Sequence, residues 1–171
     1  ATTAGTVTTA AQGNITSVGT LTSLNSGAIS SSGTVTGTSF VGIATSARYA
    51  DLAEKYTADA EYAPGTVVSF GGDAEVTAST DADTRVAGVV STNPAFTMNN
   101  NLVADHVVTV AFTGRVPCRV TGTVRKGDLM VSAGNGLARA EANPAAGTII
   151  GKALANHDGA EGTIEVVVGR F

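Results

Sequence analysis

Short apolar runs, separated by turn-forming residues, dominate the chain from Thr66 to its end. Val, Ile and other strand-favouring residues fill the runs, and Gly, Asn, Asp and Pro stand between them. The runs are TVVSF (66–70), RVAGVV (85–90), HVVTVAF (106–112), GRVPCRV (114–120), DLMVS (128–132), TIIGKAL (148–154) and TIEVVV (163–168). A spacing of about ten to fifteen residues between runs is typical of a barrel or sandwich. The pattern therefore predicts an all-β fold with a compact C-terminal domain over residues 66–171.

Two intervening segments predict how neighbouring strands are joined. The segment SAGNGLA (132–138) contains Asn135-Gly136, a strong short-range signal for a β-hairpin turn. The segment NHDGAEG (156–162) predicts a second loop between paired strands.

Residues 1–47 follow another pattern, in which isolated apolar residues recur among Gly, Ser and Thr. Similar short β-prone strings follow one another at loose spacing, which is typical of a β-solenoid or a fibrous shaft. One such chain buries too little apolar surface to offset the entropy lost on ordering. We therefore predict an intertwined homotrimeric β shaft. Its core is predicted to contain Ile15, Val18, Leu21, Leu24, Val35 and Phe40.

A flexible Ser/Gly linker is the alternative for residues 1–47. The abundance of Val, Ile and Thr favours the shaft, because β-branched residues mark strands. The first charged residue of the chain is Arg48. In a threefold bundle identical residues face one another, so a charge near the axis would meet two copies of itself at high cost. The lack of charge is therefore what a trimeric shaft requires.

The junction at residues 48–65 has a helical spacing. Tyr49, Leu52, Ala53 and Tyr56 stand at i, i+3, i+4 and i+7, which predicts a short helix, and Ser46 is placed to cap its start. Irregular structure that packs the tyrosines on the next domain is the alternative. In either case Pro64-Gly65 predicts a turn before the compact domain.

Composition and charge narrow the classes of partner. The chain has a net charge of −4 and a pI near 5.0, which argues against nucleic acid, since phosphate binding needs a clustered cationic surface. The densest basic group, formed by Arg115, Arg119, Arg125 and Lys126, fits solvated strand faces. No stretch approaches the roughly 18–20 apolar residues of a membrane span. Ala1 in place of an initiator Met suggests a processed chain or a fragment.

The sequence contains no recognisable catalytic or cofactor motif. His106 follows Asp105 and His157 precedes Asp158, but adjacent residues on a strand point to opposite faces. Cys118 is the single cysteine and is expected to pack as a small apolar residue. We therefore predict no enzyme activity, no cofactor and no metal site, with self-cleavage as the one reaction left open.

Three further positions have both a functional and a structural interpretation. Asp81 and Asp83 have the spacing of calcium ligands but lack the acidic residues that complete such a loop, which favours a solvated turn. Ser46 is a candidate nucleophile for self-cleavage, with a helix cap as the favoured role. Asn93-Pro94 is a candidate labile turn, with an ordinary turn favoured.

Several motifs resemble one family in their order and approximate spacing. They are ARYADLAEKYTADAEYAPGTVVSFGG, RVAGVVSTNPAF, VAFTGRVPCRV, VRKGDLMVSAGNGLARA and GTIIGKAL, and they span residues 48–171. These motifs resemble the C-terminal domain of bacteriophage tail-fibre and appendage proteins, including structural proteins of phages that infect cyanobacteria. The segment GNITSVGTLTSL is similar to the repetitive shaft text that precedes such domains.

The resemblance implies a homotrimeric fibre tip or cap located on the virion. Its implied partners are its own copies, other tail or baseplate proteins and a host surface receptor. A related group of these domains acts as an intramolecular chaperone that trimerises the shaft and in some members cuts itself off. The corresponding junction here is Thr45-Ser46-Ala47-Arg48, and no catalytic residue of that group matches position by position.

Three functional hypotheses follow. The first is a virion structural protein with a trimeric shaft and a capping domain, involved in host attachment. The second is a tip that binds host glycans or proteins through its loops, where Phe96 is the clearest aromatic candidate. The third is a self-cleaving chaperone domain.

Overall fold

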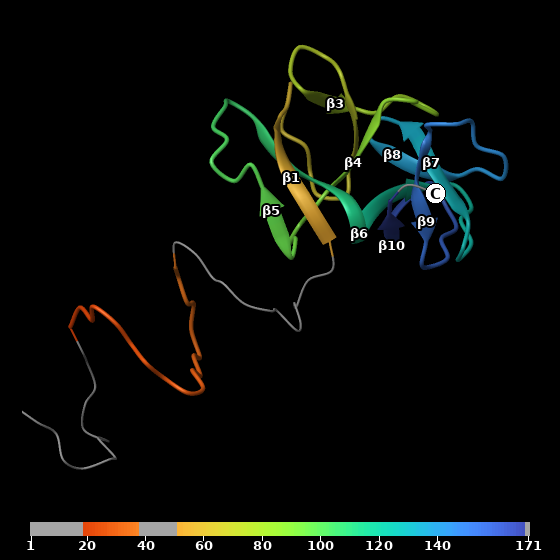
Figure 1. Ribbon diagram of the computed structural model, residues 1–171. Coiled ribbons are helices and arrows are strands. Elements are labelled where there is room, and N and C mark those ends of the chain that lie inside the picture. Colours follow the sequence, from red (N-terminus) through yellow and green to blue (C-terminus); the bar gives the residue numbers. More distant parts are fainter. Residues whose placement is uncertain (1–18, 38–50, 170–171) are drawn as a thin grey trace, which may run out of the picture. The chain divides into compact units, whose positions relative to one another are not determined.

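The computed structural model describes residues 19–37 and 51–169 (Figure 1). The chain divides into two units, residues 1–43 and 44–171. In the first unit, residues 19–37 form no strand in this single chain, and all their side chains are exposed. Of the predicted shaft core, Leu21, Leu24 and Val35 are 54%, 66% and 56% exposed. Ile15, Val18 and Phe40 lie outside the described residues, and the trimeric shaft stays a prediction.

The second unit is all-β, and its described residues contain no helix. Ten strands form one sheet with several branches. They are β1 (Asp51–Thr57), β2 (Val67–Phe70), β3 (Val76–Ala78), β4 (Val86–Val90), β5 (Phe96–Met98), β6 (Val107–Thr121), β7 (Leu129–Gly134), β8 (Leu137–Ala140), β9 (Ile149–Ala153) and β10 (Glu161–Val168). The all-β prediction is therefore confirmed for this domain.

Five of the strands close into a barrel. The order β10-β9-β7-β8-β6 returns on itself, because β10 also pairs with the second half of β6, from Gly114 to Thr121. The interior is filled mainly by small and medium apolar side chains, with fully buried Met130 as the largest. The closed ring leaves none of these five strands as a free edge, which removes the usual route to edge-to-edge aggregation.

The other five strands, β1 to β5, form an extension that begins at the first half of β6. β1 and β4 both pair there, β2 continues from β4, and β3 and β5 complete the two edges. Figure 1 shows β1 and β5 side by side at one margin of the domain. A second apolar cluster, which includes Val68, Val76, Val90, Val108 and Val110, stabilises this extension. β6 is thus the strand shared by two sub-structures.

The predicted runs HVVTVAF and GRVPCRV are one continuous strand rather than two. They join in β6 at Gly114, whose φ of 106° lies in a region that glycine adopts most readily. Pro117 is tolerated because β8 pairs with β6 at Val120 alone, so no described strand bonds to Pro117 on the side away from β10.

The helix predicted at the junction is wrong over its described part. Residues Asp51–Thr57 form β1, which pairs with β6 along its whole length. A helix of two or three turns is marginal without tertiary packing, whereas each residue of β1 gains a register partner. The spacing of Leu52, Ala53 and Tyr56 therefore did not reflect a helical face. Ala53 is completely buried, and Tyr56 packs edge-on against Phe70 with ring centroids 5.6 Å apart.

Both predicted turns are confirmed. Asn135 and Gly136 have φ values of 51° and 69°, the left-handed pair that a two-residue hairpin requires, and they join β7 to β8. The segment at 156–162 lies between the antiparallel strands β9 and β10 and contributes the first residues of β10.

Candidate functional site

A groove of about 370 Å³ lies where the extension meets the ends of β9 and β10. Its walls come from β1, β2, β4, β5 and β6 and from the ends of β9 and β10. The larger side chains that line the groove include Glu54, Tyr56, Phe70, Met98, Phe112 and Ile149. Three aromatic rings and a thioether contribute apolar surface to a lining that is about equally polar and apolar.

The polar groups of the groove are paired with each other. The Tyr56 hydroxyl donates a hydrogen bond to Glu54 Oε2 at 2.9 Å. Partial burial of the phenol, together with this bond and the negative charge of Glu54, raises the pKa of Tyr56 to about 12. The phenol therefore stays neutral at physiological pH and caps the carboxylate.

The side chains of the groove are suited to binding an apolar group. The described lining of the groove contains a carboxylate and a phenol but no histidine, cysteine or serine. Acyl transfer and acid–base chemistry use a nucleophile and a base within hydrogen-bond reach of each other. Aromatic and thioether groups instead favour contact with an apolar surface or ring.

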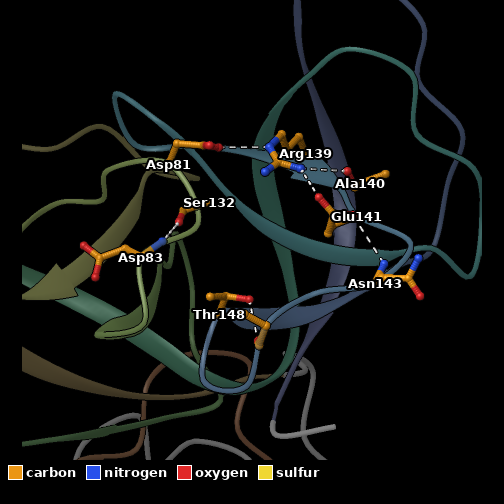
Figure 2. A network of polar contacts seen from close by, with 9 residues as sticks. Asp81, Asp83, Ser132, Arg139, Ala140, Glu141, Asn143 and Thr148 are labelled. Atoms are coloured by element: carbon orange, nitrogen blue, oxygen red, sulfur yellow. Dashed lines mark hydrogen bonds and ion pairs between the residues drawn. The ribbon is translucent and has the colours of Figure 1, made fainter.

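Asp81 and Asp83 belong to a network of polar contacts and do not form a common cation site (Figure 2). Asp81 accepts a hydrogen bond from Arg139 Nε at 2.9 Å, and Arg139 also pairs with Glu141 at 2.8 Å. Figure 2 shows Asp81 directed toward Arg139, while the Asp83 side chain lies away from that guanidinium. The two carboxylates have separate cationic partners, Arg139 for Asp81 and Arg85 for Asp83. The turn is present, but the prediction that it is solvated is wrong for Asp83, which is buried.

Asp83 is the most tightly held carboxylate of this turn. It is 7% exposed, and its Oδ1 accepts bonds from the Arg85 backbone N–H at 2.9 Å and from Arg85 Nε at 3.2 Å. Its own N–H donates to Ser132 Oγ on β7 at 2.9 Å. Burial acts to raise the pKa of Asp83, but the bonds from Arg85 and Ser69 and the charge of Arg85 outweigh it and lower the pKa to about 2. The turn is thereby fixed against the barrel.

No group of three or more metal-ligating side chains lies together among residues 19–37 and 51–169. His106 is exposed at the start of β6, and its neighbour Asp105 is exposed as well. His157 pairs with Val124 through its main chain, and its ring lies against Gly162. No described residue bonds to His157 Nε2, which is buried. The two histidines therefore stand apart and form no common site.

Cys118 is completely buried in the barrel core. Burial raises the pKa of its thiol to about 12, and the charge of Arg119 opposes this only in part. A thiol that stays protonated and inaccessible is a weak nucleophile, so Cys118 has a packing role.

The basic residues predicted to lie on solvated strand faces are mostly paired there with acids. Arg115 meets Glu165 at 3.4 Å, and Arg119 meets Glu161 at 3.4 Å. Arg125 meets Asp158 at 2.9 Å. These pairs follow the outer side of β6 and β10 and of the loop beside them, so the cations are spread out and compensated.

The two self-cleavage candidates have different outcomes. Ser46 lies outside the described residues. Asn93 lies in a bend after β4, where its N–H donates to Ser91 Oγ at 3.3 Å. This contact is that of an ordinary turn, as the sequence favoured.

One feature near the junction was missed from the sequence. Asp51, the first residue of β1, is only 6% exposed, and no described group bonds to its Oδ2. A buried acceptor without a partner is uncommon and often marks a functional constraint. The sequence offered no signal for its burial, since an aspartate off the apolar face of a predicted helix is expected at a surface.

The groove was also missed from the sequence, because its walls come from strands that are distant along the chain. The only hint was the presence of Phe70 and Phe112 at the ends of apolar runs. Phe96 is 62% exposed and Val103 is 90% exposed, so the segment between β4 and β6 presents apolar side chains to solvent. No helix of the described residues is long and apolar enough to cross a membrane.

Comparison with known proteins gives a likeness of fold. No family model matches the chain, and no curated protein matches it significantly. The crystal structure of the bacteriophage phi29 gene product 12 C-terminal fragment aligns with a TM-score of 0.53 and 13% identity, over 69% of this chain and 99% of that one. The crystal structure of the pre-mature bacteriophage phi29 gene product 12 aligns with a TM-score of 0.57 and 12% identity, over 75% of this chain and 23% of that one.

The alignment therefore includes nearly all of the phi29 fragment but less than a quarter of the pre-mature protein. At this identity the likeness establishes a shared fold. It agrees with the resemblance to phage appendage proteins, whereas the likeness to phages of cyanobacteria stays a prediction. The domain has the fold of the C-terminal fragment of a bacteriophage protein.

Proposed function

We propose that the chain is a structural protein of a bacteriophage virion, in which a trimeric N-terminal shaft is capped by the barrel domain. The observation that carries this proposal is the fold, which extends over 99% of the phi29 gene product 12 C-terminal fragment. The uncharged residues 1–47 before the domain add support, because a trimeric shaft favours such a composition. The proposed location is a tail fibre or a related appendage.

The proposed mechanism is templated assembly. Contacts between three capping domains raise the local concentration of the three shaft segments to the level set by a short tether. Pairing between distant or separate segments is slow, because the entropy of closure is lost before the contacts form. A compact domain that associates first therefore brings the shafts into register.

The oligomeric state of the complete chain tests this proposal. Light scattering of the purified protein is expected to give the mass of a trimer, and electrophoresis without boiling is expected to show an SDS-resistant band. A monomer at micromolar concentration would contradict the trimeric fibre. Adsorption of the isolated protein to host cells tests the accompanying role in attachment.

Self-cleavage is a second candidate function, which the buried Asp51 favours. Asp51 is the first acidic residue of the chain and follows the predicted junction at residues 45–48. Its buried Oδ2 bonds to no described residue, so it can accept a proton as water adds across a peptide bond near it. The phi29 protein is known both as a pre-mature form and as a C-terminal fragment, and that pairing supports a cleavage step here.

Intact-mass spectrometry separates the two candidates. Fresh full-length protein is followed over time beside the Asp51→Asn variant, in which the side chain keeps its shape. A cut near residues 45–51 in the natural chain, and none in the variant, supports self-cleavage. An unchanged intact mass after folding eliminates it and leaves the structural role standing.

A further inference from the structure

One face of the domain combines exposed aromatic side chains with very little charge. β1 and β5 run parallel, and their register places Leu52 beside Phe96 and Glu54 beside Met98. Alternate residues of a strand share a face, so Leu52, Glu54, Tyr56, Phe96 and Met98 lie on one side of this strand pair. We call these five residues the β1–β5 face.

The β1–β5 face continues into the groove. Glu54, Tyr56 and Met98 line the groove, where they meet Phe70 and Phe112. Phe96 is 62% exposed and Phe70 is 46% exposed, which is unusual for large rings at a solvated surface. Exposed apolar side chains grouped in this way commonly mark an interaction site.

The single acidic group on the β1–β5 face is held by a hydrogen bond, which the Glu54 carboxylate accepts from the Tyr56 hydroxyl. The neighbouring cation, Lys55, lies on the opposite side of β1 and donates to the carbonyl of Asn100 at 3.0 Å. A second copy of the chain would therefore meet one charged side chain, Glu54, on an otherwise uncharged face.

The connection to the shaft indicates which partner covers this face. β1 begins at Asp51, and the predicted shaft ends at residue 47. Four residue steps span at most about 14 Å of extended chain. If three chains intertwine up to residue 47, their β1 strands must begin close to the common axis. In such a trimer β5 is directly beside β1, so the β1–β5 face is expected near the point where the three domains converge.

From these observations we infer that the β1–β5 face, with Phe96 at its exposed end, contacts a second copy of this chain. In a cyclic trimer each contact is head-to-tail, so this face packs against a different surface of the neighbouring copy. The groove beside the face provides space for apolar groups of that copy. The inference rests on the trimer proposed above and specifies which surface forms it.

Thiol labelling of the complete chain tests the inference. The only natural cysteine, Cys118, is buried, so a single introduced cysteine reports on its own position. Phe96→Cys is the probe. Glu161→Cys on β10 is the matched control, because the Glu161 side chain is 61% exposed in the single chain, close to the 62% of Phe96. Each variant is labelled with a maleimide while light scattering records its mass.

In a trimer, the cysteine at position 96 is expected to label about tenfold more slowly than the one at position 161, because only the first is covered by a neighbour. Loss of the trimer in Phe96→Cys alone also supports the inference, since the ring is then needed for association. Equal fast labelling in an intact trimer overturns the inference and leaves the trimeric fibre standing. A natural chain that is monomeric overturns both.

Discussion

The two halves of β6 build two different kinds of surface from one strand. Residues 107–113 carry no charge and support the extension, with its groove and its exposed phenylalanines. Residues 114–121 belong to the closed barrel, and their two arginines pair with glutamates of β10. The barrel half is thus complete in a single chain, whereas the extension presents apolar groups that one chain leaves uncovered.

Strand edges show the same difference. Every barrel strand has two strand neighbours, because the ring is closed. In the extension, β3 and β5 each pair with one strand of the described domain. Proteins usually protect such edges with charge, proline or a covering segment. We therefore expect the barrel to contribute most of the stability and the extension to carry the proposed contact between copies.

The largest expected change in unfolding free energy comes from truncating a methionine, and the barrel and the extension each offer one. Met130 is fully buried in the barrel, and Met98 is a partly exposed residue of the groove. Met130→Ala is expected to lower the free energy of unfolding by about 2–5 kcal/mol, because it leaves a cavity in a closed ring. Met98→Ala is expected to lower it by less than about 1 kcal/mol.

Urea denaturation at one fixed chain concentration measures both variants, since association also contributes to apparent stability. Met98→Ala is expected instead to shift the concentration at which the assembly dissociates. Equal losses of unfolding free energy in the two variants would contradict the division into a stabilising barrel and an associating extension.

The next effect is expected at the turn that fastens the extension to the barrel. In Asp83→Asn the side chain keeps its shape but loses its charge-assisted bonds to Arg85. Since Arg85 is 62% exposed, solvent screening reduces the expected loss to about 1–2 kcal/mol at neutral pH. Asp81→Asn is the control, because its carboxylate is largely exposed and should contribute less than about 1 kcal/mol.

The pKa of Asp83 determines how its contribution to the free energy of unfolding changes with pH. The fold lowers the pKa of Asp83 from 3.8 to about 2, so the folded state favours the charged carboxylate. Its contribution is present above pH 4 and is lost as the pH falls from about 4 toward 2. The natural chain is expected to lose stability over this range more steeply than Asp83→Asn. Parallel pH profiles of the two proteins would contradict the assigned role of Asp83.

The sequence predicted the barrel region better than the extension, for a physical reason. Strands such as β7, β9 and β10 are bounded by local turn signals and filled with apolar residues, so local pattern and final structure agree. In β1 the local pattern DLAEKYT favours a helix, and pairing with β6 decides its conformation. A pattern read over a few neighbouring residues does not reveal contacts with residues distant in the chain.

The same reason explains which parts of the candidate site could be predicted from the sequence. Phe96 was recognised from the sequence as an exposed aromatic residue, because its loop is rich in turn-forming residues. The groove was not predicted, since Tyr56, Phe70 and Phe112 come together only through the branched sheet. The calcium alternative for Asp81 and Asp83 was disfavoured because the loop lacks further acidic ligands, and the partner of Asp81, Arg139, is brought to it only by folding.

A smaller effect is expected from the polar pair of the groove. Tyr56→Phe removes the hydrogen bond to Glu54 and keeps the ring packed against Phe70. The loss in unfolding free energy is expected to be about 0.5–1.5 kcal/mol at pH 8. The fold raises the pKa of Tyr56 from 10.0 to about 12, so this contribution is full below pH 10 and disappears as the pH rises toward 12.

Chemical denaturation at pH 8 and again at pH 11 measures the difference between Tyr56→Phe and the natural chain. The difference is expected to shrink at the higher pH, because the unfolded phenol then ionises more readily than the folded one. A difference that is unchanged would mean that the phenol is not held neutral by Glu54 and by its burial.

The smallest effect is expected on the barrel half of β6. The pairs Arg115–Glu165 and Arg119–Glu161 are both separated by 3.4 Å, and every side chain in them is at least 35% exposed. Exposed pairs of this kind contribute between about 0 and 1 kcal/mol each, because water and salt screen them. The double variant Arg115→Ala, Arg119→Ala is therefore expected to change the unfolding free energy by less than about 1 kcal/mol.

The mass of this double variant by light scattering should equal that of the natural chain, since the charged face of the barrel is expected to stay in solvent. Dissociation of this variant, with Phe96→Cys still assembled and rapidly labelled, would mean that the copies associate through the barrel half instead.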